Sequence, residues 1–372
     1  MESRVLEGKN LAVLRRRLLE WYDANRRDLP WRRSRDPYAI WVAEIMLQQT
    51  RVAVVVERYR AFMERFPSLV SLALAGEDEV LALWSGLGYY RRARLLHKAA
   101  QFVAAQYHGS LPAVAADLRT LPGIGAYTAA AISSIAHGEA VPVVDGNVER
   151  VLCRLEGWNS DGSKSTGALR RKIEAMAARL LDKARAGDFN QALMELGAVV
   201  CVPRNPRCPA CPMAQFCRTR GEHKTAPRPP MLSREVAHAL VLRMSNHARK
   251  GRAPIGREVL LERRPANQTV MRGLWELPAL RDASVPATEP RLALRHAIMK
   301  VNYYVRIREI AEEGLDRLCV AGGERRWVPL EEVSFLALTG LTRKVLQRVH
   351  LIPAGATVDA AREQGDCAAP VQ

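Results

Sequence analysis

The sequence has few aromatic residues and few acidic ones, and it lacks a long uninterrupted apolar run. Aromatic side chains make up only 6% of the 372 residues, but 48% of the chain is hydrophobic and 26% is charged, which excludes a collagen-like, low-complexity or wholly disordered chain. The longest uncharged stretch, residues 121–138, is interrupted by a proline and by glycines, so we expect no transmembrane helix. The N-terminus shows no basic segment followed by an apolar one, and we therefore predict a cytoplasmic protein without a secretory signal.

The shortage of acidic residues leaves a strong positive charge. The 56 lysines and arginines outnumber the 39 aspartates and glutamates, which gives a formal net charge of +17 and a pI near 10. An excess of this size predicts a polyanionic partner, and nucleic acid is the first to consider. Most of the excess is arginine, whose planar guanidinium suits phosphate, although a GC-rich genome also raises arginine content.

The length favours two domains, since a single domain usually has about 100–150 residues. Apolar residues recur at helical spacing in the first part of the chain, whereas strand-like alternation dominates after a proline-rich stretch. We predict a mainly helical domain over 1–226, a linker over 227–234, an α+β domain over 235–352 and a disordered tail over 353–372. The strands expected in the α+β domain are 235–244, 258–262 and 301–310, and the expected helices are 289–300 and 341–349.

Cysteine is also scarce, but four of the 7 cysteines lie in one short loop. They are Cys201, Cys208, Cys211 and Cys217, with prolines between them. In a reducing compartment this clustering favours a metal site over a disulfide framework. Four thiolates suit either tetrahedral zinc or a 4Fe-4S cluster, and the presence of a single close pair favours the cluster.

A glycine-rich turn joins two predicted helices in the middle of the first domain. A short helical stretch ends at Leu118, residues 121–125 turn the chain, and residues 126–137 form the second helix. In such a helix-hairpin-helix, Gly123 and Gly125 allow close approach of a DNA phosphate, which the N–H groups that open the second helix can hold without reading sequence. The alternative is a tight turn between helices that makes no DNA contact.

Two carboxylates stand out by their surroundings. Glu44 is the only charged residue of a helix predicted over 37–50; burial would raise its pKa and keep it protonated, as a general acid requires, although a partnered core glutamate gives the same pattern. Asp145 stands where an apolar run ends and a helix begins, so it is either an N-cap or a carboxylate that stabilises positive charge on a sugar. Gln48 and Gln49 end the first of these helices, where amides could fill the space that a flipped base leaves.

Six short motifs carry a family resemblance. They are Leu29-Pro30-Trp31-Arg32, Glu44-Ile45-Met46-Leu47-Gln48-Gln49-Thr50, Gly86-Leu87-Gly88-Tyr89-Tyr90, Leu121-Pro122-Gly123-Ile124-Gly125-Ala126-Tyr127-Thr128-Ala129, Val144-Asp145-Gly146-Asn147-Val148 and the four-cysteine loop. Together they resemble the helix-hairpin-helix DNA glycosylase superfamily, and within it the MutY family of adenine-specific mismatch glycosylases. The second domain is similar to the Nudix-like (MutT-like) domain of that family through residues 273–278 and 326–330.

The resemblance implies a base excision repair enzyme that removes adenine opposite 8-oxoguanine or guanine from duplex DNA. It implies that Glu44 protonates adenine at N7, that Asp145 stabilises the oxocarbenium ion at the sugar, and that Tyr127 and Asn147 position the reacting groups. The other implied contacts are Arg32 and Gln191 in the adenine pocket, Gln49, Leu87 and Tyr89 beside the orphaned base, and a 4Fe-4S cluster on the four cysteines. We expect a monomer associated with the nucleoid, and downstream repair enzymes as partners that take over the product.

Position 127 separates reaction types within the superfamily. A lysine there would supply the amine for Schiff-base chemistry and strand cleavage, so Tyr127 predicts a monofunctional glycosylase. Thymine-mismatch glycosylases of the superfamily also carry tyrosine here, so a thymine or uracil mismatch glycosylase is the alternative enzyme, although those proteins lack the second domain. The alternative from another class is a non-catalytic iron-sulfur DNA-binding protein.

The second domain departs from the family in the loop that reads 8-oxoguanine. The family has Phe-Ser-His there, whereas this chain has Ile298, Met299 and Lys300. The segment 308–315 also lacks the upstream glutamate and glycine of a working Nudix hydrolase. We therefore predict a recognition module without a catalytic magnesium site.

Overall fold

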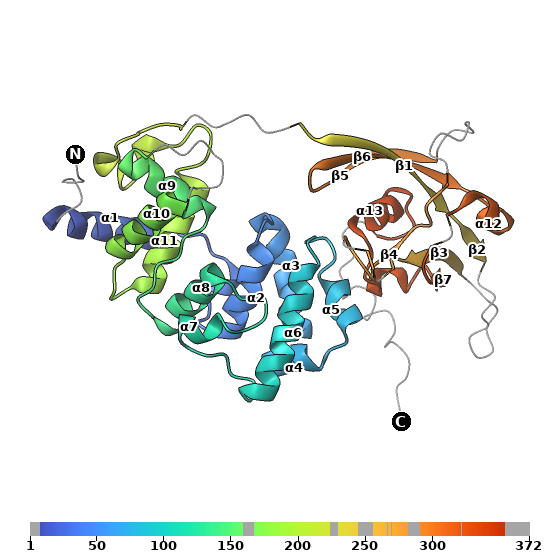
Figure 1. The fold of residues 1–372 in the computed structure, drawn as a ribbon, viewed down its shortest axis with the longest axis horizontal. Coiled ribbons are helices and arrows are strands. Elements are labelled where there is room, and N and C mark those ends of the chain that lie inside the picture. The colour runs from blue at the N-terminus through green and yellow to red at the C-terminus, as the bar shows by residue number, and fades with distance from the viewer. Residues whose placement is uncertain are drawn as a thin grey trace, which may run out of the picture. The chain divides into compact units, whose positions relative to one another are not determined.

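The computed structural model describes residues 8–158, 167–223, 230–244, 256–265, 267–268, 270–281, 291–320 and 322–353. The chain forms two compact units (Figure 1), and the second unit takes in two stretches from the first half of the sequence. The first unit is Met1–Gln49, Ser68–Ala73 and Lys98–Arg228, and the second is Thr50–Pro67, Leu74–His97 and Pro229–Gln372. The sequence-based limits of 1–226 and 235–352 stay predictions, and the predicted tail lies, apart from Pro353, outside the described residues.

The first unit is helical, as predicted. Its α-helices are α1 (Lys9–Asn25), α2 (Pro37–Leu47), α4 (Leu69–Leu74), α7 (Ala115–Leu118), α8 (Ala126–His137), α9 (Gly146–Glu156), α10 (Gly167–Leu180), α11 (Ala186–Val199) and the second half of α6 (Arg91–Gln106). Short 3-10 helices are η2 (Pro30–Arg32), η3 (Cys208–Ala210) and η4 (Ala214–Phe216). None of the helices in the described part of the chain combines the length and the apolarity of a membrane span.

Helix α2 begins as predicted but ends early. The Asp36 carboxylate accepts hydrogen bonds from the main-chain N–H groups of Tyr38 and Ala39, and proline occupies the first helical position, both of which favour a helix start. The predicted helix over 37–50 is wrong at its end, because Gln48 leaves the helical conformation and Gln49 takes a positive φ of 57°. Gln48 is therefore the C-cap of α2 and does not continue its face.

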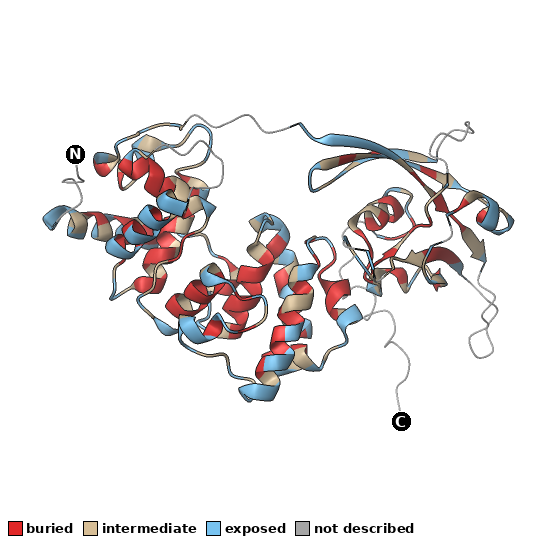
Figure 2. Cartoon of the chain, viewed as in Figure 1, coloured by how far each residue is buried: buried red, intermediate tan, exposed pale blue. Residues whose placement is uncertain are grey.

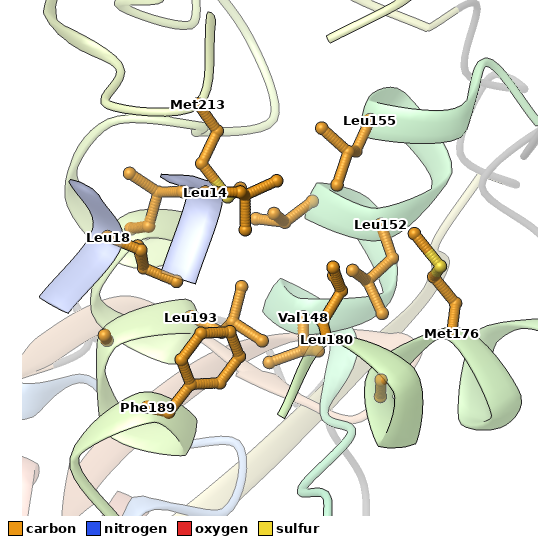
Figure 3. Close-up of a cluster of buried hydrophobic side chains, with 14 of the residues drawn as sticks. Leu14, Leu18, Val148, Leu152, Leu155, Met176, Leu180, Phe189, Leu193 and Met213 are labelled. Atoms are coloured by element: carbon orange, nitrogen blue, oxygen red, sulfur yellow. The ribbon is translucent and has the colours of Figure 1, made fainter. Parts of the chain in front are cut away.

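A core of apolar side chains fixes the helices that carry the site. Helices α1, α9, α10 and α11 contribute Leu14, Leu18, Val148, Leu152, Leu155, Met176, Leu180, Phe189 and Leu193, all buried (Figure 3). Pairs of these residues are four positions apart on one helix, so each helix presents one apolar stripe to the others. Each fully buried aliphatic side chain of this kind contributes about 1.5–3 kcal/mol. This core therefore holds α9 and α11 against one another, and part of the site, namely Asn147, Gln191 and Glu195, lies on these two helices.

The second unit combines α-helices with two small sheets, which confirms the predicted α+β class of the C-terminal half. Its helices are α3 (Val52–Arg65), α5 (Glu77–Leu83), the first half of α6, α12 (Leu315–Leu318), α13 (Gly340–Arg348), η5 (Glu312–Gly314) and η6 (Val333–Phe335). Its strands are β1 (Leu232–Leu240), β2 (Leu242–Met244), β3 (Arg257–Arg263), β4 (Trp275–Glu276), β5 (Leu292–Ile298), β6 (Val301–Glu309) and β7 (Arg325–Pro329).

The two sheets are built differently. In the first, β6 is central, β1 runs parallel to it and β5 runs antiparallel. In the second, β3 pairs antiparallel with β2, β4 and β7. Parts of α13 and of the strands are coloured as buried in Figure 2. Their buried apolar residues form one cluster, to which α13 contributes Val345 and Leu346.

The predicted helix over 289–300 is wrong. Its described part is β5, which returns through a turn at Met299 and Lys300 and pairs with β6 along its whole length. Leu294 is buried in β5 while its neighbours Ala293 and Arg295 are exposed. Such two-residue alternation is a strand pattern. The helix-forming residues of this segment favoured a helix in the sequence-based prediction, because the pairing with β6 that stabilises the strand cannot be read from the segment alone.

Candidate active site

Glu44 is buried on α2 with a tyrosine as its partner. Only 6% of the residue is exposed, and the Tyr127 hydroxyl donates a hydrogen bond of 2.7 Å to Glu44 Oε2. The pKa of Glu44 is raised from 4.5 to about 7, chiefly by burial; the Tyr127 hydrogen bond and Arg32 lower it, and the nearby charge of Asp145 raises it. A carboxyl group with this pKa is partly protonated at neutral pH and can donate a proton.

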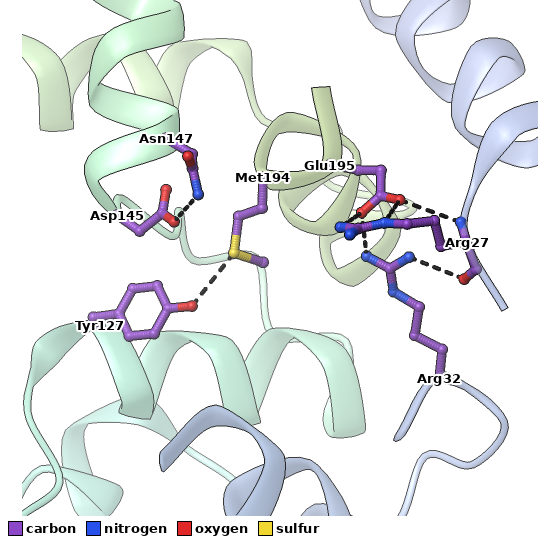
Figure 4. Close-up of polar contacts among 7 residues, drawn as sticks. All are labelled: Arg27, Arg32, Tyr127, Asp145, Asn147, Met194 and Glu195. Carbon is purple, nitrogen blue, oxygen red and sulfur yellow. Dashed lines mark hydrogen bonds and ion pairs between the residues drawn. The ribbon is translucent and has the colours of Figure 1, made fainter. Parts of the chain in front are cut away.

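Tyr127 lies in the first turn of α8. Its hydroxyl also contacts Met194 Sδ of α11 at 3.4 Å (Figure 4). Burial, together with the neighbouring carboxyl groups Glu44 and Asp145, raises the pKa of Tyr127 well above its ordinary value. The hydroxyl is therefore a proton donor over the whole neutral range, and it offers no amine for covalent chemistry.

Asp145 is the N-cap of α9, so the structural reading of this residue is confirmed. Its Oδ1 accepts the main-chain N–H of Val148 at 2.7 Å, and its Oδ2 accepts the Asn147 side-chain amide at 2.9 Å (Figure 4). Arg150 in turn donates to Asn147 Oδ1 at 2.9 Å. The N-terminus of a helix stabilises a negative charge, and two fixed hydrogen bonds orient the carboxylate. The N-cap role and a role opposite developing positive charge are thus compatible.

A buried ion-pair cluster, absent from the sequence prediction, lies on α11. Glu195 is 1% exposed and binds Arg27 at 2.6 Å and Arg32 at 2.8 Å (Figure 4). Burial would raise the pKa of Glu195, but hydrogen bonds from both guanidinium groups lower it to about 2. Arg32, which was expected in the adenine pocket, is thus tied to Glu195. Gln191 is partly buried on α11, one turn before this cluster.

The helix-hairpin-helix forms as predicted, between α7 and α8. Leu121 and Ile124 are buried and anchor the turn, whereas Gly123 and Gly125 are exposed, and Gly123 has a φ of 78°. Gly125 is the N-cap of α8 and has no side-chain cap. A Cβ atom at Gly125 would meet nothing within 4 Å, so the first turn of α8 is open to a ligand on this side. Gln48 Nε2 donates to Thr128 Oγ1 at 3.4 Å and links α2 to the same helix.

Three residues predicted beside the orphaned base have different exposures. Gln49 is exposed with a φ of 57°, and Tyr89 is 48% exposed with a φ of 48°. Such backbone conformations are costly for residues other than glycine and cluster at functional sites. Leu87, by contrast, is only 5% exposed, so it can reach DNA only if its loop moves.

The four cysteines surround one cavity. Its lining includes Cys201, Cys208, Cys211 and Cys217 together with Val151, Leu155, Leu196 and Arg154. Arg154 donates to Cys201 Sγ at 3.4 Å, and Arg150 donates to the Cys201 main-chain oxygen at 2.9 Å. Within the described residues no three potential ligands converge on a position for a single metal ion. Four thiols around an apolar cavity match the ligand number of a thiolate-bound cluster, and the cation beside Cys201 suits its negative charge.

These features define a class of protein. A helix-hairpin-helix, a buried carboxyl group and a cysteine loop belong together in base excision repair glycosylases, and residues 42–178 match the family model described as HhH-GPD superfamily base excision DNA repair protein. Residues 201–217 match the model described as the iron-sulfur binding domain of endonuclease III. This match confirms the predicted iron-sulfur cofactor, and four cysteines are the usual ligand number of a 4Fe-4S cluster.

The relatives narrow the class further, and the chain belongs to the adenine DNA glycosylase family. It is 47% identical to the adenine DNA glycosylase of Mycolicibacterium smegmatis over 204 residues, 55% of this chain and 68% of that protein. It is 48% identical to the adenine DNA glycosylase of Homo sapiens over 219 residues, 56% of this chain and 40% of that protein. The chain thus spans less than half of the human relative. A solved thermostable thymine-DNA glycosylase is 29% identical with a TM-score of 0.51, covering 56% of this chain and 96% of that structure.

Proposed function

We propose that this chain is a monofunctional glycosylase that flips adenine out of duplex DNA and cleaves its N-glycosidic bond. The observation that carries the proposal is the pair of Glu44 and Tyr127, a buried carboxyl group with a pKa near 7 held by a hydroxyl at 2.7 Å. The family relationship supports adenine as the base, and the opposite base that we propose is 8-oxoguanine or guanine.

In the proposed reaction Glu44 donates its proton to adenine N7 and makes the base a leaving group. As the bond between the base and C1′ breaks, positive charge develops on the sugar, and the carboxylate of Asp145 stabilises that charge. Water then adds to C1′, and the proton that it loses returns Glu44 to its acid form. Asn147 orients the carboxylate through its amide, and Tyr127 holds the acid. Water addition yields an abasic site and leaves the phosphate backbone intact, because Tyr127 provides no amine.

The remaining residues are proposed to hold the DNA. The exposed turn at Gly123 and Gly125 would bind a backbone phosphate with main-chain N–H groups. Gln49 and Tyr89 are exposed in strained conformations, and we assign them to the DNA stack beside the flipped base. Arg32, which is paired with Glu195, would help to shape the adenine pocket rather than bind the base directly. Gln191, one turn before Glu195 on α11, would line the same pocket. When bound, the cluster on the four cysteines would stiffen the loop that carries Arg204 and Arg207 toward phosphates.

The setting of this activity is also a proposal. We infer that the chain acts as a monomer on nucleoid DNA and passes its abasic product to downstream repair enzymes. The C-terminal half would act as a recognition module, and its resemblance to a Nudix domain remains a prediction. The hairpin tip is exposed there, with Met299 70% exposed.

The test is base release from defined duplexes by cluster-loaded full-length protein. We expect adenine from A opposite 8-oxoguanine and A opposite guanine, and no strand cleavage before alkali treatment. Release of thymine from G·T duplexes, with adenine retained, would replace the proposal by the alternative of a thymine glycosylase. The similarity to a solved thymine-DNA glycosylase is the observation behind that alternative. If no base is released from any duplex, the enzyme proposal fails and the alternative of a non-catalytic DNA-binding protein takes its place.

The opposite-base preference needs a separate measurement. Residues 50–67 and 74–97 belong to the same compact unit as the C-terminal half, so truncation would disturb the rest of that unit. Point substitutions at the hairpin tip are cleaner. We expect Met299→Ala combined with Lys300→Ala to reduce the ratio of excision rates for 8-oxoguanine over guanine if the tip contacts the opposite base. An unchanged ratio would assign that recognition to another surface.

A further inference from the structure

The loop that carries Leu87 and Tyr89 belongs to the same compact unit as the C-terminal half of the chain. The unit contains residues 74–97 together with everything after Pro229. The loop, residues 86–89, contains Gly86 with a φ of 98°, Gly88 with a φ of 69° and Tyr89 with a φ of 48°. The two glycines adopt positive φ without strain, so the strain of this loop lies at Tyr89, whose conformation its surroundings must maintain.

Two buried hydrogen bonds hold the ends of this loop. On one side, the Tyr90 hydroxyl donates to the main-chain oxygen of Leu338 at 2.8 Å. On the other side, Arg343 Nε of α13 donates to Ser85 Oγ at 2.7 Å. Tyr90 is 4%, Ser85 0% and Arg343 6% exposed. Both bonds join positions about 250 residues apart in sequence, and neither is weakened by competing water.

The buried position of Arg343 carries a cost that a simple packing residue would not have. Its guanidinium also donates to the main-chain oxygen of Ser334 at 3.5 Å, so within the described residues it is satisfied by neutral oxygens rather than by an ion pair. Burial lowers its pKa, and the neighbouring Arg58 lowers it further. Burying a cation is costly unless it is hydrogen-bonded, and in some proteins such groups specify a geometry.

More exposed contacts also join the segments that flank the loop to the C-terminal half. Arg263 of β3 pairs with Asp78 of α5 at 3.1 Å, and Arg94 of α6 donates to the Arg272 main-chain oxygen at 2.7 Å. These groups are more exposed, so each contributes little by itself. Within the loop, Trp84 Nε1 donates to the Gly88 oxygen at 3.1 Å. The buried pair at Tyr90 and Arg343 is therefore the part of this network that can fix the loop.

We propose that Tyr90 and Arg343 are positioning residues, through which the C-terminal half holds residues 86–89 in the strained form that presents Tyr89 to DNA. The proposal rests on the proposed function, since it assigns this loop to the DNA stack. Neither residue contacts the base or the sugar; each acts through the loop. The C-terminal half then affects the rate of excision itself, in addition to any reading of the opposite base.

The experiment compares matched substitutions in full-length, cluster-loaded protein. Tyr90→Phe and Arg343→Met each remove one of the two bonds, and Tyr107→Phe and Arg348→Met are the controls, since both control residues are exposed and Arg348 lies on the same helix as Arg343. Hydrogen–deuterium exchange of peptides covering residues 84–90 reports the loop without DNA. Single-turnover excision and affinity for an undamaged duplex are measured on the same samples.

We expect exchange at 84–90 to become about tenfold faster in Arg343→Met and a few-fold faster in Tyr90→Phe, because a hydrogen bond from a charged donor is the stronger one. Excision should slow with little change in duplex affinity, and both controls should match the wild type. If Arg343→Met does not fold, Ser85→Ala removes the same bond from the loop side and should give the same pattern.

Three results separate the possibilities. Unchanged exchange in both variants would overturn the proposal, and so would faster exchange with excision at the wild-type rate. If the wild-type protein excises no base, the proposed function fails, while the exchange data still decide whether these two residues hold the loop.

Discussion

Replacing Glu44 by glutamine should make the protein more stable and at the same time inactive. Glu44 is 6% exposed and its pKa is raised from 4.5 to about 7, chiefly by burial. Glutamine has nearly the same shape, its carbonyl oxygen can still accept the Tyr127 hydroxyl, and it carries no charge to desolvate. It has no proton of suitable acidity for a leaving base. Stability and activity should therefore change in opposite directions.

The magnitude follows from linkage between protonation and folding. The folded-state pKa lies above the unfolded one, so Glu44 costs nothing well below pH 4.5, and its cost grows as the pH rises and is complete above about pH 7. At about 1.36 kcal/mol per pKa unit, the full cost is about 3 kcal/mol. Glu44→Gln should then exceed the wild type in free energy of unfolding by about 3 kcal/mol at pH 8 and by about 1 kcal/mol at pH 5.

The assay is equilibrium urea denaturation of cluster-loaded wild type and variant at both pH values, beside single-turnover adenine release. Glu64→Gln is the control, because Glu64 is exposed on α3 and the same chemical change there should leave stability within about 0.5 kcal/mol at either pH. Excision by Glu44→Gln should fall by about 100-fold or more, with duplex affinity retained. A stability difference that is the same at pH 5 and pH 8 would refute the raised pKa, and equal loss of excision and DNA binding would make Glu44 structural.

Three other substitutions test the surroundings of this acid. Tyr127→Phe removes a hydrogen bond that lowers the pKa of Glu44, so the falling limb of the excision rate should move to higher pH in single-turnover profiles; a limb that stays in place contradicts this. Glu195→Gln should lower the free energy of unfolding at pH 7 by about 3 kcal/mol, and the loss should shrink as the pH falls from 4.5 toward the folded-state pKa of about 2, as followed by denaturation. Gly197→Ala would place its Cβ 2.6 Å from Asn147 Cβ and should slow excision by about tenfold or more, measured beside a thermal melt that shows the variant folded.

Local sequence patterns predict much of the candidate site. The lone charge of Glu44 in an apolar helix predicts a buried carboxyl group, and the glycine turn before Tyr127 predicts where the next helix starts, so both ends of the observed hydrogen bond are visible in the sequence. Their contact, between positions 83 residues apart, is not, because spacing along the chain does not specify which helices pack together. The family resemblance implied that Tyr127 and Asn147 help to position the reacting groups, but it did not predict the hydrogen bonds to Glu44 and Asp145.

Other features were missed for physical reasons that can be named. Glu195 shows the same signal as Glu44, a single charge within the apolar turn 192–197, and could have been found, but its partners Arg27 and Arg32 are distant in sequence. The grouping of residues 74–97 with the C-terminal half depends on contacts between positions far apart in the sequence, which leave no local pattern. Strand β5 is defined by pairing with β6, and short apolar runs do not distinguish strand from helix without a partner.

Helix α11 makes the hydrophobic core and the chemistry difficult to separate. Along consecutive turns it buries Phe189 and Leu193 in the core. It also places Met194 against the Tyr127 hydroxyl and Glu195 against two arginines, and it packs Gly197 against α9. A small tilt of this one helix changes all of these distances together. Substitutions deep in the core, far from any reacting atom, can therefore behave as active-site mutations, yielding a protein that folds, carries its cluster and binds DNA but no longer aligns its acid with the base.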